Sequence, residues 1–251
     1  EITLGQLVTV NGYLWMLNNP LRQAGWLVND ISNFTTSVEK IYATYSEEPH
    51  VKTPVSGVVK KHLKGEIEFK NVSYRADDED IVMDVNFKVK PGQTVGIIGS
   101  TGAGKSTIMN LLCRFYDTTS GEVLVDGVNV RDMDLYNLRD NIGMAMQDVF
   151  LFSDTIVGER GVGLSGGQKQ RISLARALLK DPSILILDDT TSAVDMETES
   201  YIQSQLKKLD NKCTIFVIAY RISSIRDADL ILVMDNGRII EQGTHEQLVA
   251  A

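Results

Sequence analysis

Two short stretches of this sequence carry residue types that suit phosphate and metal chemistry. The first, Gly99 to Ser106, reads GSTGAGKS and fits the spacing G-x-x-x-x-G-K-[ST] of a phosphate-binding loop. Glycines let the backbone curl so that successive N–H groups point at phosphate oxygens, and the positive end of the next helix adds to the attraction. We expect Lys105 to reach the β- and γ-phosphates of a nucleotide and the Ser106 hydroxyl to ligate Mg²⁺. The predicted phosphate-contacting residues are Gly99, Ser100, Thr101, Gly102, Ala103, Gly104, Lys105, Ser106 and Thr107.

The second stretch, Ile184 to Asp189, reads ILILDD, an apolar run that ends in two carboxylates. Beside a phosphate loop, we expect Asp188 to lie near the Mg²⁺, usually through a water. Asp189, one residue further, can face the γ-phosphate and polarise an attacking water. The alternatives on spacing alone are a strand-end acid that caps the next turn and a solvated loop acid.

These residues need strands and helices to position them. Val95 to Ile98 is a short apolar run typical of a strand, and the helical pattern TIMNLLCRF follows the loop. EIEFKNVSY and IVMDVNFKVK alternate apolar and polar residues like strands, and the turn signal Pro91-Gly92 ends the second. Short apolar runs then alternate with helical patterns, which predicts an α/β domain.

The N-terminal part has a different pattern. Leu4 to Leu17 is apolar but too short to cross a bilayer, so it is either the last turns of a membrane helix or a buried soluble helix. It lacks the charged start and cleavage site of a signal peptide. Apolar residues recur at helical spacing from Leu21 to Tyr45, and the prolines, glycines and lysines of residues 49–64 predict a linker.

Composition limits the class of protein. The 251 residues are 43% hydrophobic and carry a net charge of −8, which suits a globular core and argues against non-specific nucleic-acid binding. Cys113 and Cys213 lie in apolar surroundings and are interpreted as core thiols of a reducing compartment.

Further motifs give the sequence a family resemblance. LSGGQKQRISLARALLKDP precedes the carboxylate strand, MAMQDVFLF contains Gln147, and SAVD ends at Asp195. With the phosphate loop, these resemble the nucleotide-binding domain of an exporter-type ATP-binding-cassette (ABC) transporter. The resemblance implies an α/β P-loop cassette with a mixed parallel core sheet and an antiparallel β subdomain over residues 65–251. Residues 1–48 resemble the helical end of a transmembrane domain.

The resemblance also implies roles for single residues. Tyr74 would stack on adenine, and Gln147 would sense the γ-phosphate and contact Mg²⁺. Ser165, Gly166, Gly167 and Gln168 belong to the signature that closes over ATP held by a partner subunit. Asp195 would cross the interface between the two cassettes. ATP, Mg²⁺, a second half-transporter subunit and a cell membrane are the implied partners, with the cassette on the cytoplasmic side.

Two departures from the family pattern concern catalysis. Asp189 stands where the family has glutamate, and Tyr220 stands where it has histidine. The shorter acid loses about 1.5 Å of reach toward the water, and a phenol with a pKa near 10 is no substitute for imidazole. We therefore expect a site that binds ATP but hydrolyses it poorly, completed as a heterodimer with a subunit that carries the usual residues.

A third departure is the short span between Gln147 and Leu164. The family places a helical subdomain there, so near residues 156–157 this chain has a shortened or missing subdomain, or is a truncated copy. The alternatives to an exporter subunit are a soluble ABC-type ATPase, a non-hydrolysing nucleotide-gated regulator and a non-functional fragment.

Overall fold

The chain divides into two units. The computed structural model describes residues 3–49, 51–146, 165–188, 213–219 and 222–250, and its two compact units are Glu1–His50 and Val51–Ala251. We call the second unit the cassette. Gln147, Asp189 and Tyr220, to which the resemblance gives catalytic roles, lie outside the described residues, as does Asp195. They therefore stay predictions from the sequence.

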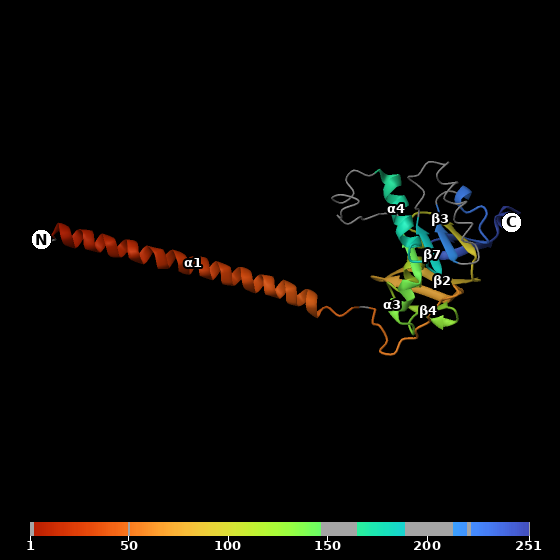
Figure 1. The fold of residues 1–251 in the computed structure, drawn as a ribbon, viewed down its shortest axis with the longest axis horizontal. Helices are drawn as coiled ribbons and strands as arrows, with labels where there is room; N and C mark the ends of the chain where they lie inside the picture. Colours follow the sequence, from red (N-terminus) through yellow and green to blue (C-terminus); the bar gives the residue numbers. More distant parts are fainter. Residues whose placement is uncertain (1–2, 50, 147–164, 189–212, 220–221, 251) are drawn as a thin grey trace. The chain divides into compact units, whose positions relative to one another are not determined.

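The first unit consists of one 43-residue helix, α1 (Leu4–Ser46), as the apolar spacing from Leu21 to Tyr45 predicts (Figure 1). Its side chains are exposed along the whole length, including Trp15, Trp26 and Phe34. Among the described residues, no helix combines the length and the apolar character that crossing a bilayer requires.

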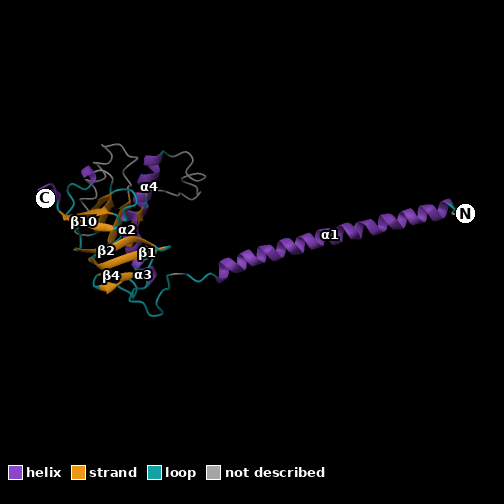
Figure 2. Ribbon diagram, turned by 180° about the vertical axis from the view of Figure 1, so that it is seen from behind, coloured by secondary structure: helices purple, strands orange, loops and turns teal. Residues whose placement is uncertain are grey.

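The described residues of the cassette form two sheets. The smaller sheet is antiparallel, with the strand order β2-β1-β4-β5. The larger one has the order β10-β9-β3-β8-β7-β6, and all its pairs are parallel except β9 with β10. Figure 2 shows both sheets as orange strands. The strands are β1 Ile67–Ala76, β2 Glu79–Val89, β3 Thr94–Gly99, β4 Ser120–Val125, β5 Val128–Asn129, β6 Ile142–Ala145, β7 Ile184–Asp188, β8 Thr214–Ile218, β9 Leu230–Asp235 and β10 Arg238–Gly243.

The predicted mixed core sheet and antiparallel subdomain are thus confirmed. The parallel strands are continuous apolar runs because both of their faces are buried. Short helical elements connect the strands: α2 Lys105–Leu112, α3 Leu135–Asp140, α4 Gly166–Leu178, the 3₁₀ turn η3 Ile222–Ser224 and α6 His245–Ala250.

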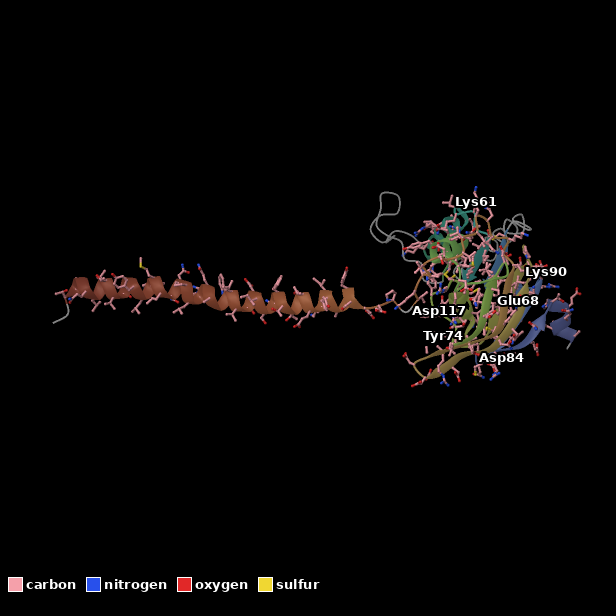
Figure 3. The ribbon with its side chains drawn as sticks, turned by 90° about the horizontal axis from the view of Figure 1, so that it is seen from below. Lys61, Glu68, Tyr74, Asp84, Lys90 and Asp117 are labelled. Atoms are coloured by element: carbon pink, nitrogen blue, oxygen red, sulfur yellow. The ribbon has the colours of Figure 1, made fainter. Side chains whose placement is uncertain are left out.

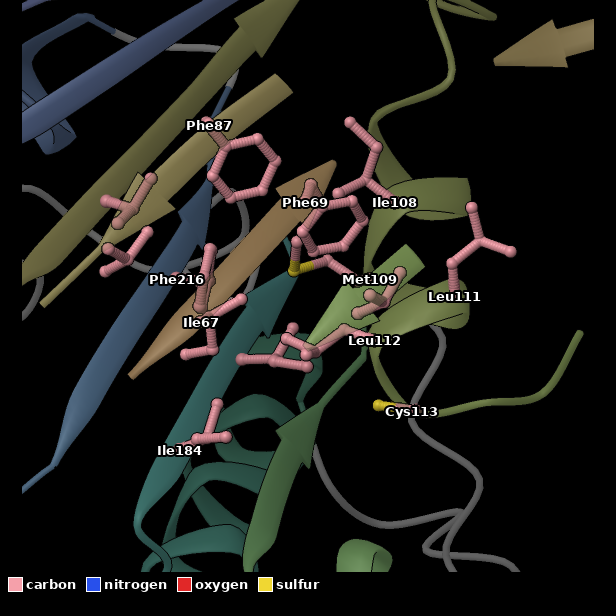
Figure 4. Close-up of a cluster of buried hydrophobic side chains, with 14 of the residues drawn as sticks. Ile67, Phe69, Phe87, Ile108, Met109, Leu111, Leu112, Cys113, Ile184 and Phe216 are labelled. Atoms are coloured by element: carbon pink, nitrogen blue, oxygen red, sulfur yellow. The ribbon is translucent and has the colours of Figure 1, made fainter. Parts of the chain in front are cut away.

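The main hydrophobic core joins both sheets to α2. Phe69 of β1 stacks on Phe87 of β2 with ring centroids 4.5 Å apart. Ile108 of α2 and Phe216 of β8 belong to the same buried cluster (Figure 4). Because α2 is packed into this cluster, the helix that follows the glycine loop is held firmly at its buried face.

Candidate functional site

The glycine loop lies between the end of β3 and the start of α2. Gly102 and Gly104 have φ values of 84° and 91°, a left-handed conformation that glycine adopts without strain. A Cβ on Gly99 would lie 2.2 Å from the carbonyl oxygen of Met234, so a side chain cannot fit there. The backbone therefore requires glycine at the positions where the motif has it.

Lys105 folds back over this loop. Its Nζ donates hydrogen bonds to the carbonyl oxygens of Gly99 and Ser100, at 2.9 Å and 2.7 Å, and the residue is only 4% exposed. Burial lowers the pKa of Lys105, and the negative charge of Asp188 partly opposes that effect. The ammonium is thus held at the loop, where it can reach a phosphate.

The other motif residues lie around the opening of the loop. Ser100, Thr101, Gly102 and Ser106 are exposed, Thr107 is half-buried, and Ala103, Gly104 and Lys105 are buried. The amide of Ala103 donates to the carbonyl oxygen of Ser100 at 3.2 Å, which closes the turn. The loop therefore presents an exposed edge to an incoming ligand above a buried base.

The structure brings Asp188 to the phosphate loop. The Ser106 hydroxyl donates to Oδ2 of Asp188 at 3.1 Å, although 82 residues separate them. In the sheet, β8 intervenes between β3 and β7, and Ser106 at the start of α2 reaches across this gap. A hydroxyl and a carboxylate are hard oxygen donors that fit Mg²⁺, which binds through one or two protein ligands plus phosphates and waters. The two predicted metal ligands that the structure describes are therefore together.

Tyr74 lies on β1 in the antiparallel sheet (Figure 3). It pairs with Val82 across the antiparallel sheet, and a Cβ on Gly104 would lie 3.3 Å from Cγ2 of Val82. Burial raises the pKa of Tyr74, so its phenol stays neutral. Tyr74 is only partly buried, which leaves ring surface for a flat ligand.

Sequence reasoning missed Tyr116. Its ring centroid lies 5.3 Å from that of Tyr74 at an angle of 30°, and the residue is 46% exposed. The available signal was that a second aromatic residue, Tyr116, directly follows the helical pattern TIMNLLCRF. The two tyrosines together present an aromatic surface that Tyr74 alone does not.

The signature residues form the start of α4. Ser165 is the N-cap of that helix: its hydroxyl accepts from the Gln168 amide at 3.3 Å, and its own amide donates to Oε1 of Gln168 at 2.9 Å. Gly166 and Gly167 follow in the first turn. Leu174 and Ala177 anchor α4 in a cluster with residues of β6, β7 and β8. The signature thus starts a well-packed helix with a reciprocally bonded first turn.

This arrangement defines a class of protein. The parts of a P-loop nucleotide-binding domain are all present. They are a strand, a glycine loop, a buried lysine at a helix start, and a strand-end aspartate beside the serine that follows the lysine. The order and geometry of these parts separate it from a glycine-rich turn with a chance lysine.

Comparison with known proteins narrows the class. The ABC transporter family matches residues 82–162 and 151–192. A Bacillus subtilis (strain 168) protein named as a multidrug export ATP-binding/permease protein is 41% identical over 99% of this chain. A heavy metal tolerance protein of Schizosaccharomyces pombe is 38% identical over 98% of it. The solved structure of a bacterial Atm1-family ABC exporter with ATP bound has a TM-score of 0.83 and 34% identity over 99% of this chain. The chain therefore contains an ABC transporter domain, which the family model matches between residues 82 and 192.

The chain is shorter than these proteins. It spans 50% and 35% of the two curated relatives and 51% of the solved exporter chain. Its alignment with the Bacillus subtilis protein covers 292 positions, whereas the chain has 251 residues, so at least 41 of those positions have no residue in this chain.

Proposed function

We propose that this chain binds Mg-ATP at the phosphate loop and serves as the ATP-binding part of an ABC exporter. The observation that carries the proposal is the convergence of Lys105, Ser106 and Asp188 at the start of α2. Lys105 would hold the β- and γ-phosphates, and Tyr74 would stack on the adenine. Ser106, Asp188 and Gln147 would hold the Mg²⁺, which offsets phosphate charge when bound.

The direct test is calorimetric titration of the full chain with Mg-ATP, compared with the Lys105→Ala variant. We expect binding in the micromolar range for the wild type and about 10- to 100-fold weaker binding in the variant, because the charge-assisted hydrogen bonds of the buried ammonium are lost. The exposed Lys90 provides a matched control, and Lys90→Ala should bind as the wild type does. A folded wild-type chain that takes up no Mg-ATP would contradict the proposal.

The transport role rests on further support. The relatives at 41% and 38% identity are named for multidrug export and for heavy metal tolerance. The helix α1 exposes large apolar side chains all along its length, and such a helix needs a partner or a lipid environment to cover it. Both observations favour a cassette joined to a transmembrane domain at the cell membrane, on the cytoplasmic side. The acidic net charge of −8 makes nucleic acid an unfavourable partner.

We further propose that the ATP site of this chain is hydrolytically impaired. Asp189 offers a carboxylate one methylene shorter than the family's glutamate, and Tyr220 replaces the family's histidine. A general base must lie within hydrogen-bond reach of its water, so the shorter side chain should slow the reaction. The intact signature at Ser165 would instead complete the active site of a second half-transporter subunit that carries the usual residues. A non-hydrolysing regulator is the second candidate function, and the same two substitutions favour it.

A complementation experiment separates these readings. One chain carries Asp189→Glu and Tyr220→His, which repair its site, together with Gly166→Asp, which breaks its signature. An aspartate in the first turn of a helix is favourable, so Gly166→Asp should not impair folding. Its negative charge should repel the γ-phosphate and so inactivate the signature. The second chain is the wild type. Each alone should release phosphate slowly, and the mixture should release it about 100-fold faster, since general-base catalysis contributes 10²–10⁴-fold.

The outcome discriminates between the candidates. A fast mixture supports head-to-tail pairing in which the wild-type signature completes the repaired site. A mixture as slow as its components, formed from chains that both bind Mg-ATP, contradicts that pairing and favours the regulator.

The span between Gln147 and Leu164 bears on coupling. We propose that the helical subdomain normally found there is shortened near residues 156–157. The alignment positions that have no residue in this chain support that proposal. The subdomain contacts the membrane domain in the family pattern, so insertion of a relative's segment at this position should increase transport-coupled turnover without changing ATP affinity.

A further inference from the structure

The residues that join the two units are fastened to the cassette. We call Val51–Glu66 the strap. It has no helix, and among the described residues its β-pairing with the rest of the cassette is an isolated bridge between Val58 and Met133. The amide of Val58 donates to the carbonyl oxygen of Asp132 at 2.8 Å, and the amide of Asp134 donates back to Val58 at 3.0 Å. The proline- and glycine-containing composition that predicts a linker therefore coexists with specific attachment.

Two polar side chains hold the later part of the strap. Asn137 of α3 accepts from the Lys60 amide at 3.0 Å and donates to the Lys60 carbonyl oxygen at 3.1 Å. The carboxylate of Asp126, in the turn after β4, accepts from the amides of Lys64 and Glu66 at 2.6 Å and 2.9 Å. The teal loop that passes α3 and β4 in Figure 2 is this strap.

A third side chain, Arg114, holds the beginning of the strap. Its Nη2 donates to the carbonyl oxygen of Lys52 at 3.0 Å. Lys52 is the second residue of the cassette unit. Its Nε donates to Oδ1 of Asp117 at 2.9 Å, and Nη1 donates to the carbonyl oxygen of Val130 at 3.4 Å. The residue is only 4% exposed, so the guanidinium is a buried junction between the strap and the cassette.

The backbone at Arg114 adopts a conformation in which glycine is usual. Arg114 has a φ of 51° just beyond α2, where its amide bonds to Leu111 and the Phe115 amide bonds to Asn110. These are the two bonds of a Schellman motif, whose left-handed position is usually glycine. A residue with a side chain is strained in that conformation. Arginine occupies the position despite this strain, and its three bonds offset the cost.

One short helix therefore connects the nucleotide site to the strap. Lys105 and Ser106 form the first turn of α2, and Arg114 follows its C-terminus. The helix is eight residues long, about 12 Å at 1.5 Å per residue, and its buried apolar residues pack in the main core. A short helix packed along one face is stiff, so a shift at its phosphate-binding end would also act on Lys52 through Arg114.

We propose that Arg114 is a positioning residue that couples occupancy of the phosphate loop to the start of the strap, and hence to the chain segment that precedes it. This inference rests on the proposed ATP binding. Coupling of this kind is reciprocal: nucleotide changes the stability of the strap's attachment, and the attachment changes nucleotide affinity by the same factor.

The test is hydrogen exchange of the amides in residues 51–60 of the full chain, with and without Mg-ATP, beside calorimetric binding of Mg-ATP to the same samples. For the wild type we expect Mg-ATP to change these exchange rates by at least about fivefold. Arg114→Gly removes the side chain while keeping the turn, and should abolish the change. Arg114→Lys keeps the charge but loses the forked geometry, and should also abolish it.

The matched control is Arg131→Lys. Arg131 also contacts Asp117 and donates to the carbonyl oxygen of Thr118, but it makes no described contact with the strap, so its variant should keep the wild-type response. Wild-type binding of Mg-ATP without any change at residues 51–60 would overturn this inference alone, as would a full response in both Arg114 variants. A wild-type chain that binds no Mg-ATP would overturn the proposed function and this inference together.

Discussion

The starts of α2 and α4 use similar residues in different ways. Both helices begin with glycine and serine at or next to the first turn. In the described part of the chain, no side chain caps α2, whose N-cap Gly104 is left-handed and precedes the buried Lys105. In contrast, Ser165 and Gln168 bond reciprocally at the start of α4. A phosphate bound at α2 would replace the carbonyl partners of Lys105, whereas a phosphate bound at α4 would compete with an existing cap.

The difference shows that residue type alone does not make an anion site. The N–H groups at a helix start attract anions only to the extent that no other acceptor already holds them. This chain should therefore bind ATP at α2 on its own. The start of α4 should contribute only when a nucleotide held by another subunit offers acceptors better than the Ser165 hydroxyl.

The largest effect on this contrast should come from Lys105→Ala. Loss of charge-assisted hydrogen bonds of about 1.5–3 kcal/mol should weaken Mg-ATP binding by about 10- to 100-fold. Calorimetry measures the Mg-ATP affinity of the variant, and circular dichroism checks that the variant is folded. Unchanged affinity in a folded variant would mean that the open start of α2 is not the ATP site.

A smaller effect should come from Ser106→Ala. The variant loses the hydroxyl that contacts Asp188, and with it one predicted Mg²⁺ ligand. We expect about tenfold weaker ATP binding in Mg²⁺ and little change in EDTA, because one bond to a charged group is lost. An equal loss under both conditions would assign Ser106 to phosphate contact instead of metal binding.

The next smaller effect should come from substituting Ser165, the N-cap of α4. Ser165→Ala should lower the free energy of unfolding by about 1 kcal/mol, and Ser165→Gly by only a few tenths, because glycine is tolerated at an N-cap. Urea denaturation of both variants measures these two changes in the free energy of unfolding. Mg-ATP affinity of the chain alone should not change, and a clear loss of affinity would place α4 in this chain's own site.

The smallest effect should be the pH dependence of Lys105. Burial lowers the pKa of this lysine in the folded chain, so between that value and the ordinary lysine value the unfolded chain binds more protons. The free energy of unfolding should therefore rise with pH across that window in the wild type relative to Lys105→Ala. Mg-ATP binding needs the ammonium and should weaken as pH rises through the same window. Parallel pH profiles in the two proteins would show that Lys105 is not desolvated.

Local sequence determines much of this site. The phosphate loop and Asp188 were predictable because glycine conformations and strand-end positions follow from short motifs. Tyr116 beside Tyr74 was not, because 42 residues separate the two positions and only the fold brings them together. The bond from Arg114 to Lys52 was equally hidden. A linker is predicted because its apolar residues show no helix or strand spacing. That pattern does not reveal which of its backbone groups will bond to side chains distant in the sequence.

The two cysteines offer an internal way to follow opening of the cassette. Cys113 belongs to the main core and Cys213 to the separate cluster under α4, and burial raises the pKa of both thiols to about 12. A thiolate is the reactive form, and at pH 8 its share should be on the order of one in ten thousand. A thiol-reactive dye should therefore label each cysteine only when its own surroundings open. The two labelling rates would then show whether the sheet region and the signature-helix region of the cassette unfold together or one before the other.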